Sequence, residues 1–129
     1  MNTETNKLKI LVIEDEESLL NAITSSLEDA GFEVIKSRIA DQALQYLKDI
    51  SRVDLIWLDH YLLGEDGIIF TKKIKAEAAF KDIPIFVVSN SEDEANEKQY
   101  LSLGAIRYFT KSENSLEKII GEIKEYLQK

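Results

Sequence analysis

The chain has no cysteine, one proline, one histidine and few glycines. The lack of cysteine excludes disulfides and thiol chemistry, and it fits a reducing cytoplasm. A lone histidine cannot form a histidine metal cluster. No apolar run approaches the roughly 20 residues that span a bilayer, and the polar start over residues 1–7 lacks the apolar stretch of a signal peptide.

Basic residues are also scarce. Lys and Arg together number 16 against 24 Asp and Glu, which gives a formal net charge of −8. Because each phosphate contact of a nucleic acid needs a Lys or Arg, this balance argues against direct binding to nucleic acid. It argues equally against an anionic membrane surface. A protein of this charge that handles phosphate needs a cation to offset its own carboxylates.

The length of 129 residues is that of one domain. With 44% hydrophobic and 31% charged residues, the composition is that of a globular domain rather than a disordered chain. We expect residues 1–7 to form a flexible leader and residues 8–129 to form the domain. The chain shows no internal repeat and no low-complexity tract.

Short apolar runs alternate with amphipathic stretches along the whole chain. The runs predict strands at residues 8–13, 32–35, 55–58, 85–88 and 106–109. The helical spacing of apolar residues predicts helices at residues 18–30, 40–50, 68–76 and 115–127, and residues 93–103 are expected to form a weaker, mostly polar helix. This order predicts an α/β fold with a doubly wound, five-stranded parallel sheet covered on both faces. Ligands of such sheets bind beyond the carboxyl ends of the strands.

Polar side chains stand at those strand ends. They are Glu14 and Asp15, Asp59, Ser89 and Lys111. Each residue alone has an ordinary structural explanation: acids before a helix interact with its dipole, Asp59 or Ser89 caps a helix, and Lys111 is a solvated lysine. Gathered at one edge, however, the carboxylates would repel one another, and a hard divalent cation is the expected partner for their oxygens.

Formal charges favour a phosphoryl site at this edge. Glu14, Asp15 and Asp59 contribute three negative charges, and Lys111 with a Mg²⁺ ion contributes three positive charges. Without the metal, an incoming phosphate meets net repulsion. Each charge pair at ~4 Å is worth roughly 4 kcal/mol at an effective dielectric constant of ~20.

These residues, in this order and spacing, resemble the receiver domain of two-component response regulators. The resemblance runs from about Leu8 to Leu127 and is strongest in four segments. They are residues 10–16 (ILVIEDE), Asp59 with Gly67, residues 83–89 (IPIFVVS), and Gly104-Ala105 with Tyr108 and Lys111. It implies a flavodoxin-like strand order of 2-1-3-4-5 with five helices.

The resemblance also implies roles for individual residues. Asp59 would accept a phosphoryl group from a phosphohistidine, assisted by Lys111, and Ser89 and Tyr108 would switch the surface formed by the fourth helix, fifth strand and fifth helix. Mg²⁺ (or Mn²⁺) would be held by Asp15, Asp59, Glu14 and the backbone carbonyl of Tyr61. The implied partners are a sensor histidine kinase or histidine phosphotransfer protein, and a downstream target or an output domain absent from this chain. The implied protein is a cytoplasmic signalling domain rather than a turnover enzyme, and a homodimer is possible.

The sequence departs from the family pattern at three positions. Glu14 stands where Asp is commoner, Leu63 replaces the usual proline, and Ser112 stands where a proline normally follows the lysine in a cis peptide. The last change leaves the path of the Lys111 loop open. We also expect His60 to be a solvent-facing loop residue and Trp57 to lie in the core.

Three other functions are weighed against this one. An aspartyl phosphatase would need a second acid two residues after its nucleophile, where this chain has Tyr61. A flavin carrier would need a Ser/Thr/Gly-rich loop where this chain has residues 14–17 (EDEE). The main alternative is a phosphorylation-independent pseudo-receiver that acts as a protein interaction module.

Overall fold

The computed structural model describes residues 7–50, 52–62, 65–90 and 94–128. Its five strands are β1 (Lys9–Ile13), β2 (Glu33–Ser37), β3 (Leu55–Leu58), β4 (Ile85–Ser89) and β5 (Arg107–Thr110). Its five α-helices are α1 (Glu17–Asp29), α2 (Ala40–Asp49), α3 (Gly67–Ala76), α4 (Glu94–Ser102) and α5 (Leu116–Leu127). The strands form one parallel sheet in the order β2-β1-β3-β4-β5, which confirms the predicted topology.

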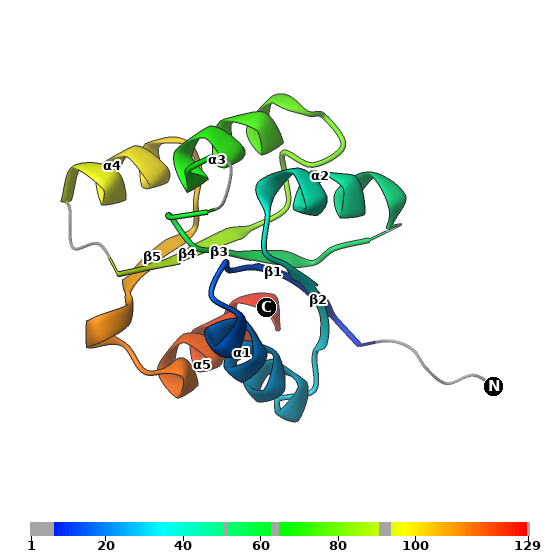
Figure 1. The fold of residues 1–129 in the computed structure, drawn as a ribbon, viewed down its shortest axis with the longest axis vertical. Coiled ribbons are helices and arrows are strands. Elements are labelled where there is room, and N and C mark those ends of the chain that lie inside the picture. The colour runs from blue at the N-terminus through cyan, green and yellow to red at the C-terminus, as the bar shows by residue number, and fades with distance from the viewer. Residues whose placement is uncertain (1–6, 51, 63–64, 91–93, 129) are drawn as a thin grey trace.

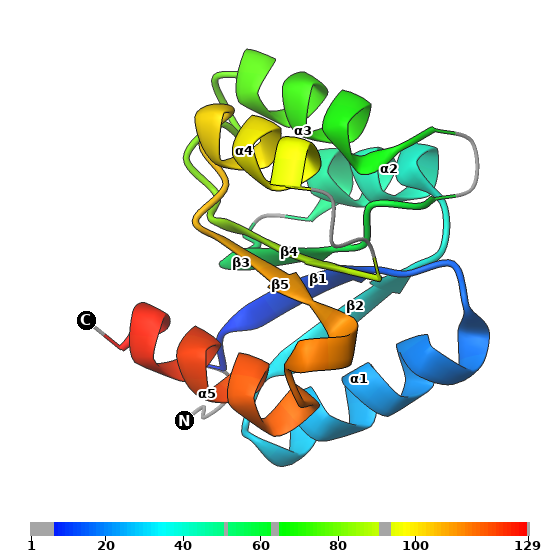
Figure 2. The same ribbon diagram turned by 90° about the vertical axis from the view of Figure 1, so that its left-hand side faces the viewer.

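The helices cover both faces of the sheet. Helices α2, α3 and α4 lie on one face, and α1 and α5 lie on the other (Figures 1 and 2). Successive side chains of a strand point to opposite faces, so each strand contributes to two separate cores. Val12, Trp57 and Phe86 pack with α1 and α5, whereas Leu11 and Ile56 pack with α2, α3 and α4.

The central strands are buried on both sides because the sheet is covered on both sides. All four residues of β3 and all five of β4 are buried. Their sequences therefore read as continuous apolar runs rather than as alternating ones. Trp57 is completely buried, as expected.

The observed boundaries differ from the predicted ones by one or two residues, and one element was not predicted. A short 3₁₀ helix (η1, Lys111–Glu113) follows β5. The peptide bond between Lys111 and Ser112 is trans, as are the other peptide bonds of the described residues. The expected flexible leader lies, except for Lys7, outside the described residues, and so does Leu63. No helix within the described ranges is long and apolar enough to cross a membrane.

Candidate functional site

Parallel pairing brings the polar strand ends to one edge of the sheet. Ile13 pairs with Leu58, so the residues that follow them, Glu14 and Asp59, leave neighbouring strands at the same level. Ser89 is the last residue of β4 and pairs with Thr110, the residue before Lys111. The register therefore assembles the residues that the sequence singled out.

Three carboxylates meet at this edge. Glu14, Asp15 and Asp59 each offer an oxygen, and these oxygens all lie within 4.8 Å of one another. Glu14 and Asp59 are only 1% and 4% exposed, while Asp15 is half-buried. The cluster is therefore largely removed from water on one side and open on the other, at Asp15.

Lys111 supplies the positive charge of the cluster. Its Nζ donates to Glu14 Oε1 at 3.0 Å and lies 3.7 Å from Asp59 Oδ1. The Lys111 loop, whose path the sequence left open, thus runs as the short helix η1 and places the ammonium group beside both buried acids. One ammonium against three carboxylates leaves two negative charges without a counter-charge in the cluster.

The pKa of Asp59 reflects this imbalance. Burial and, next, the charge of Glu14 raise the pKa of the Asp59 carboxyl to about 7, although Lys111 acts in the opposite direction. At neutral pH Asp59 is therefore close to half-protonated when no cation is bound. A cation bound beside Asp59 would lower this pKa and favour the ionised carboxylate.

The donor set fits a hard divalent cation. Carboxylate oxygens are the ligands that Mg²⁺ and Mn²⁺ take in proteins, and three of them converge here. Two uncompensated negative charges match the charge of such an ion. The site thus has the ligand chemistry and the charge for a divalent cation such as Mg²⁺.

The remaining predicted residues lie around the cluster. Ser89 is buried at the end of β4. Tyr108 lies on β5, half-buried, with its ring 5.8 Å from the ring of Tyr100. Tyr61 lies in the loop after Asp59 with 57% of its surface exposed, and a single bridge pairs it with Asp66. All the predicted site residues are therefore brought to the same end of the sheet or to β5 beside it.

The prediction for His60 was wrong. Its side chain is not solvent-facing but 7% exposed, and Nδ1 lies 2.6 Å from the hydroxyl of Tyr100 on α4. Sequence position alone suggested a loop residue. The ring is buried because α4 packs over the loop. The residues around His60 in the sequence give no indication of this packing.

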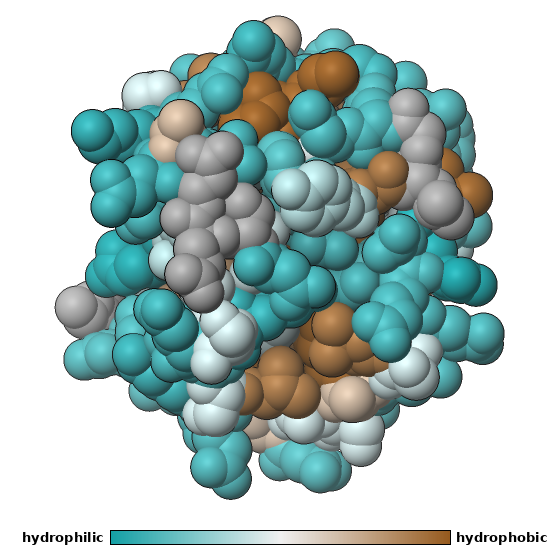
Figure 3. Space-filling model, turned by 60° about the vertical axis from the view of Figure 1, so that its left-hand side comes forward, coloured by the Kyte–Doolittle hydropathy of each residue, from teal (hydrophilic) through white to brown (hydrophobic). Residues whose placement is uncertain are grey.

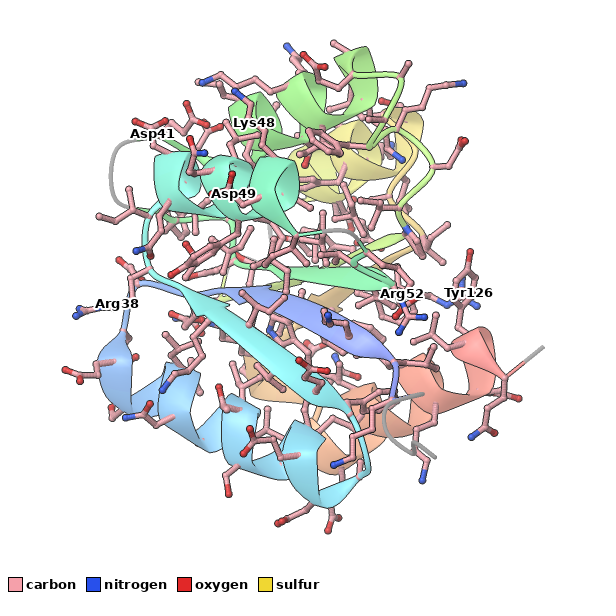
Figure 4. All side chains as sticks on the ribbon, turned by 90° about the vertical axis from the view of Figure 1, so that its right-hand side faces the viewer. Arg38, Asp41, Lys48, Asp49, Arg52 and Tyr126 are labelled. Atoms are coloured by element: carbon pink, nitrogen blue, oxygen red, sulfur yellow. The ribbon has the colours of Figure 1, made fainter. Side chains whose placement is uncertain are left out.

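Arg38 is a contributor that the sequence reasoning missed. Its Nε and Nη2 donate to the backbone carbonyl oxygen of Asp15 at 3.0 and 2.8 Å. Figure 4 shows it at the carboxyl end of β2, at the opposite end of the molecule from Arg52 and Tyr126. The available signal was its position one residue after β2, at the edge of the sheet where the acids gather.

An apolar pocket opens beside the acidic cluster. Figure 3 shows apolar side chains in a hollow of an otherwise mostly polar surface, on the face formed by α1 and α5. The pocket there has a volume of about 270 Å³. It is lined by Leu19, Ile23, Trp57, Val88, Lys111, Asn114, Ser115, Leu116 and Ile119. Lys111 thus borders both the acidic cluster and this pocket.

Comparison with known proteins gives consistent matches. A family model described as the response regulator receiver domain matches residues 10–124. The phosphate regulon transcriptional regulatory protein PhoB of Pseudomonas aeruginosa is 35% identical over 102 residues, 79% of this chain and 44% of that protein. The alkaline phosphatase synthesis transcriptional regulatory protein PhoP of Bacillus subtilis is 34% identical over 103 residues, 80% of this chain and 42% of that protein. The chain thus spans less than half the length of these curated relatives.

Solved structures match over nearly the whole chain. The phosphorylated cyanobacterial phytochrome response regulator RcpA has a TM-score of 0.84 and 31% identity, and the match covers 95% of this chain and 94% of that one. The chemotaxis response regulator CheY4 of Vibrio cholerae has a TM-score of 0.83 at 22% identity, covering 93% and 98% of the two chains. The second likeness is one of fold alone.

Proposed function

The chain belongs to the family of response regulator receiver domains of two-component systems, and from that premise we propose that Asp59 is its phosphoacceptor. The observation that carries the proposal is the cluster of Glu14, Asp15 and Asp59 with Lys111 beside it. In-line phosphoryl transfer needs positioning and charge neutralisation more than covalent machinery. A buried carboxylate with a lysine at 3.7 Å supplies both in part.

The reaction we propose is a transfer between two protein side chains. A carboxylate oxygen of Asp59 attacks the phosphorus of a phosphohistidine, the P–N bond breaks, and a mixed acyl phosphate forms. Lys111 then bonds a phosphoryl oxygen and exchanges its pairing with Glu14 for that contact. The carboxyl group of Asp59 must be ionised to attack, and its raised pKa means that the metal-free site is only partly ready at neutral pH.

Mg²⁺ is the cofactor that we propose for this site. Asp15 and Asp59 would hold it directly, with Glu14 and the backbone carbonyl of Tyr61 completing the protein ligands. When bound, the ion neutralises the charge of the acids and of the transferring phosphoryl group. Mn²⁺ takes the same kind of ligand and is expected to substitute.

Phosphorylation is proposed to act through Ser89 and Tyr108. The hydroxyl of Ser89, at the end of β4, would move to the phosphoryl group, and the ring of Tyr108 would turn inward. That change would alter the surface formed by α4, β5 and α5. The domain is consumed and restored in this cycle, so it is a signalling domain rather than an enzyme with turnover of an external substrate.

The phosphoryl donor is proposed to be a sensor histidine kinase or a histidine phosphotransfer protein in the cytoplasm. The apolar pocket between α1 and α5 is compatible with a protein donor, because it offers a partner side chain an apolar hollow bordered by Lys111. The chain spans only 44% of the Pseudomonas aeruginosa relative, a transcriptional regulatory protein. We propose that the receiver passes its signal to a separate protein or to an output domain, with a homodimer as one form in which it acts.

The test is the intact mass of the protein after incubation with acetyl phosphate. We expect the gain of one phosphoryl group in the wild type with Mg²⁺, and no gain with EDTA or in Asp59→Asn. Absence of the adduct in a folded wild type with Mg²⁺ would instead identify a pseudo-receiver that acts by binding alone. An adduct that persists in Asp59→Asn would move the acceptor to another residue.

A further inference from the structure

His60 and Tyr100 form a buried hydrogen bond between the loop that follows Asp59 and helix α4. The distance from His60 Nδ1 to the Tyr100 hydroxyl is 2.6 Å, and His60 Nε2 lies 3.4 Å from Asn96 Nδ2. The two side chains are 7% and 0% exposed. Tyr100 and Asn96 both belong to α4. The imidazole ring of His60, the residue next to Asp59, therefore contacts two residues of that helix.

The start of α3 leaves room for this contact. A Cβ atom at Gly67 would clash with the Tyr100 hydroxyl, so a larger residue there would displace the ring. The Gly67 backbone N–H in turn donates to the His60 carbonyl at 2.8 Å. Burial raises the pKa of Tyr100 well above its usual value. The hydroxyl therefore keeps its proton and is able to donate it to Nδ1.

Helix α4 depends on this tyrosine for its attachment. Among its nine residues, Tyr100 is the one that is buried. The other residues of the helix, which include the apolar Ala95 and Leu101, are exposed or half-buried, so the buried packing of α4 is concentrated on one ring. The hydroxyl of that ring is hydrogen-bonded to His60, the residue adjacent to the proposed phosphoacceptor.

The same ring also contacts the proposed switch residue. The centroid of Tyr100 lies 5.6 Å from that of His60 and 5.8 Å from that of Tyr108. Figure 2 shows α4 beside β5 at the edge of the sheet. A displacement of α4 or an inward turn of Tyr108 must therefore change the surroundings of Tyr100 and strain its bond to His60.

We propose that His60 and Tyr100 are positioning residues that hold α4 in the arrangement of the unphosphorylated domain. The proposal rests on the proposed function, since it assigns a second connection, besides Ser89, between Asp59 and the α4–β5–α5 surface. If the arrangement of α4 is coupled to phosphorylation of Asp59, each affects the equilibrium of the other by the same free energy. A substitution that destabilises the unphosphorylated arrangement of α4 therefore favours phosphorylation. A single net hydrogen bond corresponds to about a two- to tenfold change in such an equilibrium.

The decisive variant is Tyr100→Phe, which removes one oxygen and keeps the ring. We expect it to accept the phosphoryl group from acetyl phosphate with Mg²⁺ about two- to tenfold faster than the wild type. The matched control is Tyr126→Phe, which removes a hydroxyl at the far end of α5 (Figure 4) and should keep the wild-type rate. Amide NMR spectra of the unphosphorylated proteins should show the α4 signals of Tyr100→Phe moved toward their phosphorylated positions.

A double-mutant cycle separates the bond from general loosening of the fold. His60→Phe keeps a ring at this position but removes Nδ1, so Tyr100→Phe should have no further effect on the rate in that background. Equal rates for Tyr100→Phe and Tyr126→Phe, or a slower rate for Tyr100→Phe, would overturn the proposal. A wild type that takes up no phosphoryl group would refute the proposed function instead, which keeps the two failures distinct.

Discussion

At the scale of single residues, the site is dominated by the cost of burying like charges. Glu14 and Asp59 are both almost fully buried, and they share one ammonium group. Removing a charged partner from such a group usually destabilises a protein. Here the excess is of negative charge, so removing one carboxylate is expected to have the opposite effect.

Asp59→Asn should therefore stabilise the metal-free protein. The pKa of Asp59 is raised from 3.8 to about 7 in the fold, so between these values the native state binds the proton more tightly than the unfolded chain. Wild-type stability consequently falls as the pH rises through that window, and below it the group contributes nothing. With one pKa unit worth about 1.36 kcal/mol, we expect a gain on the order of 4 kcal/mol at pH 8 that vanishes by pH 4.

Urea unfolding in EDTA at the two pH values measures this difference. Asp49→Asn is the control, because it removes the same charge from an exposed position on α2 (Figure 4). That variant should change the free energy of unfolding by less than about 0.5 kcal/mol. An equal gain in both variants would trace the effect to net charge rather than to the buried cluster.

Tyr61 is expected to slow the loss of the phosphoryl group. Its ring lies against His60, with centroids 4.6 Å apart, and it stands two residues beyond Asp59. We expect this ring, although 57% exposed, to shield an acyl phosphate on Asp59 from water. Tyr61→Gly should therefore shorten the lifetime of the phosphorylated domain severalfold, whereas Tyr61→Phe should keep it. The decay of the phosphoryl mass after removal of acetyl phosphate gives both lifetimes, and an unchanged decay in Tyr61→Gly contradicts the prediction.

At the scale of the elements, periodicity was a sufficient guide to the helices and strands. The amphipathic stretches predicted α1, α2, α3 and α5, because a helix that covers a sheet must bury one stripe of side chains. Helix α4 differs, since Tyr100 is its one buried residue. Gly31 follows the first helix with φ +99°, a conformation that glycine adopts without strain. The 3₁₀ helix at Lys111–Glu113 was missed because three residues are too short for any periodic signal.

Helix α5 offers a prediction at this scale. The Ser115 hydroxyl oxygen accepts from the Lys118 backbone N–H at 3.1 Å and caps the helix. Ser115→Ala should cost about 1 kcal/mol in the free energy of unfolding. Ser25→Ala, on the exposed side of α1, should cost little or nothing. Denaturant midpoints of the two variants give the comparison, and equal midpoints would mean that the cap contributes nothing.

At the scale of the whole molecule, we expect the net charge of −8 and the acidic edge to make the stability of the fold respond to divalent cations. An ion that binds the native state alone stabilises it by mass action, by about 2.7 kcal/mol at a hundred times its dissociation constant. Mg²⁺ should therefore raise the melting temperature in proportion to the logarithm of its concentration. The effect should be smaller at pH 5 than at pH 8, because below about 7 the proton on Asp59 competes with the ion.

Thermal unfolding with Mg²⁺ at both pH values tests this expectation. Asp15→Asn should weaken the effect, since it removes an exposed-side ligand of the cluster without disturbing the buried pair. A melting temperature that does not respond to Mg²⁺ in the wild type would count against a metal site at this edge.

The amino-acid sequence by itself determined the alternation of strands and helices, the parallel sheet and the candidate residues Asp15, Asp59 and Lys111. These follow from local periodicity and from the rule that parallel strands end at one edge, neither of which needs coordinates. The carboxylate separations, the Lys111 contacts and the raised pKa of Asp59 were decided by the tertiary structure, because they depend on burial and on side-chain directions across separate strands. The burial of His60 belongs to the same class: it exists only because α4 brings Tyr100 over a glycine that is 33 residues away in the chain.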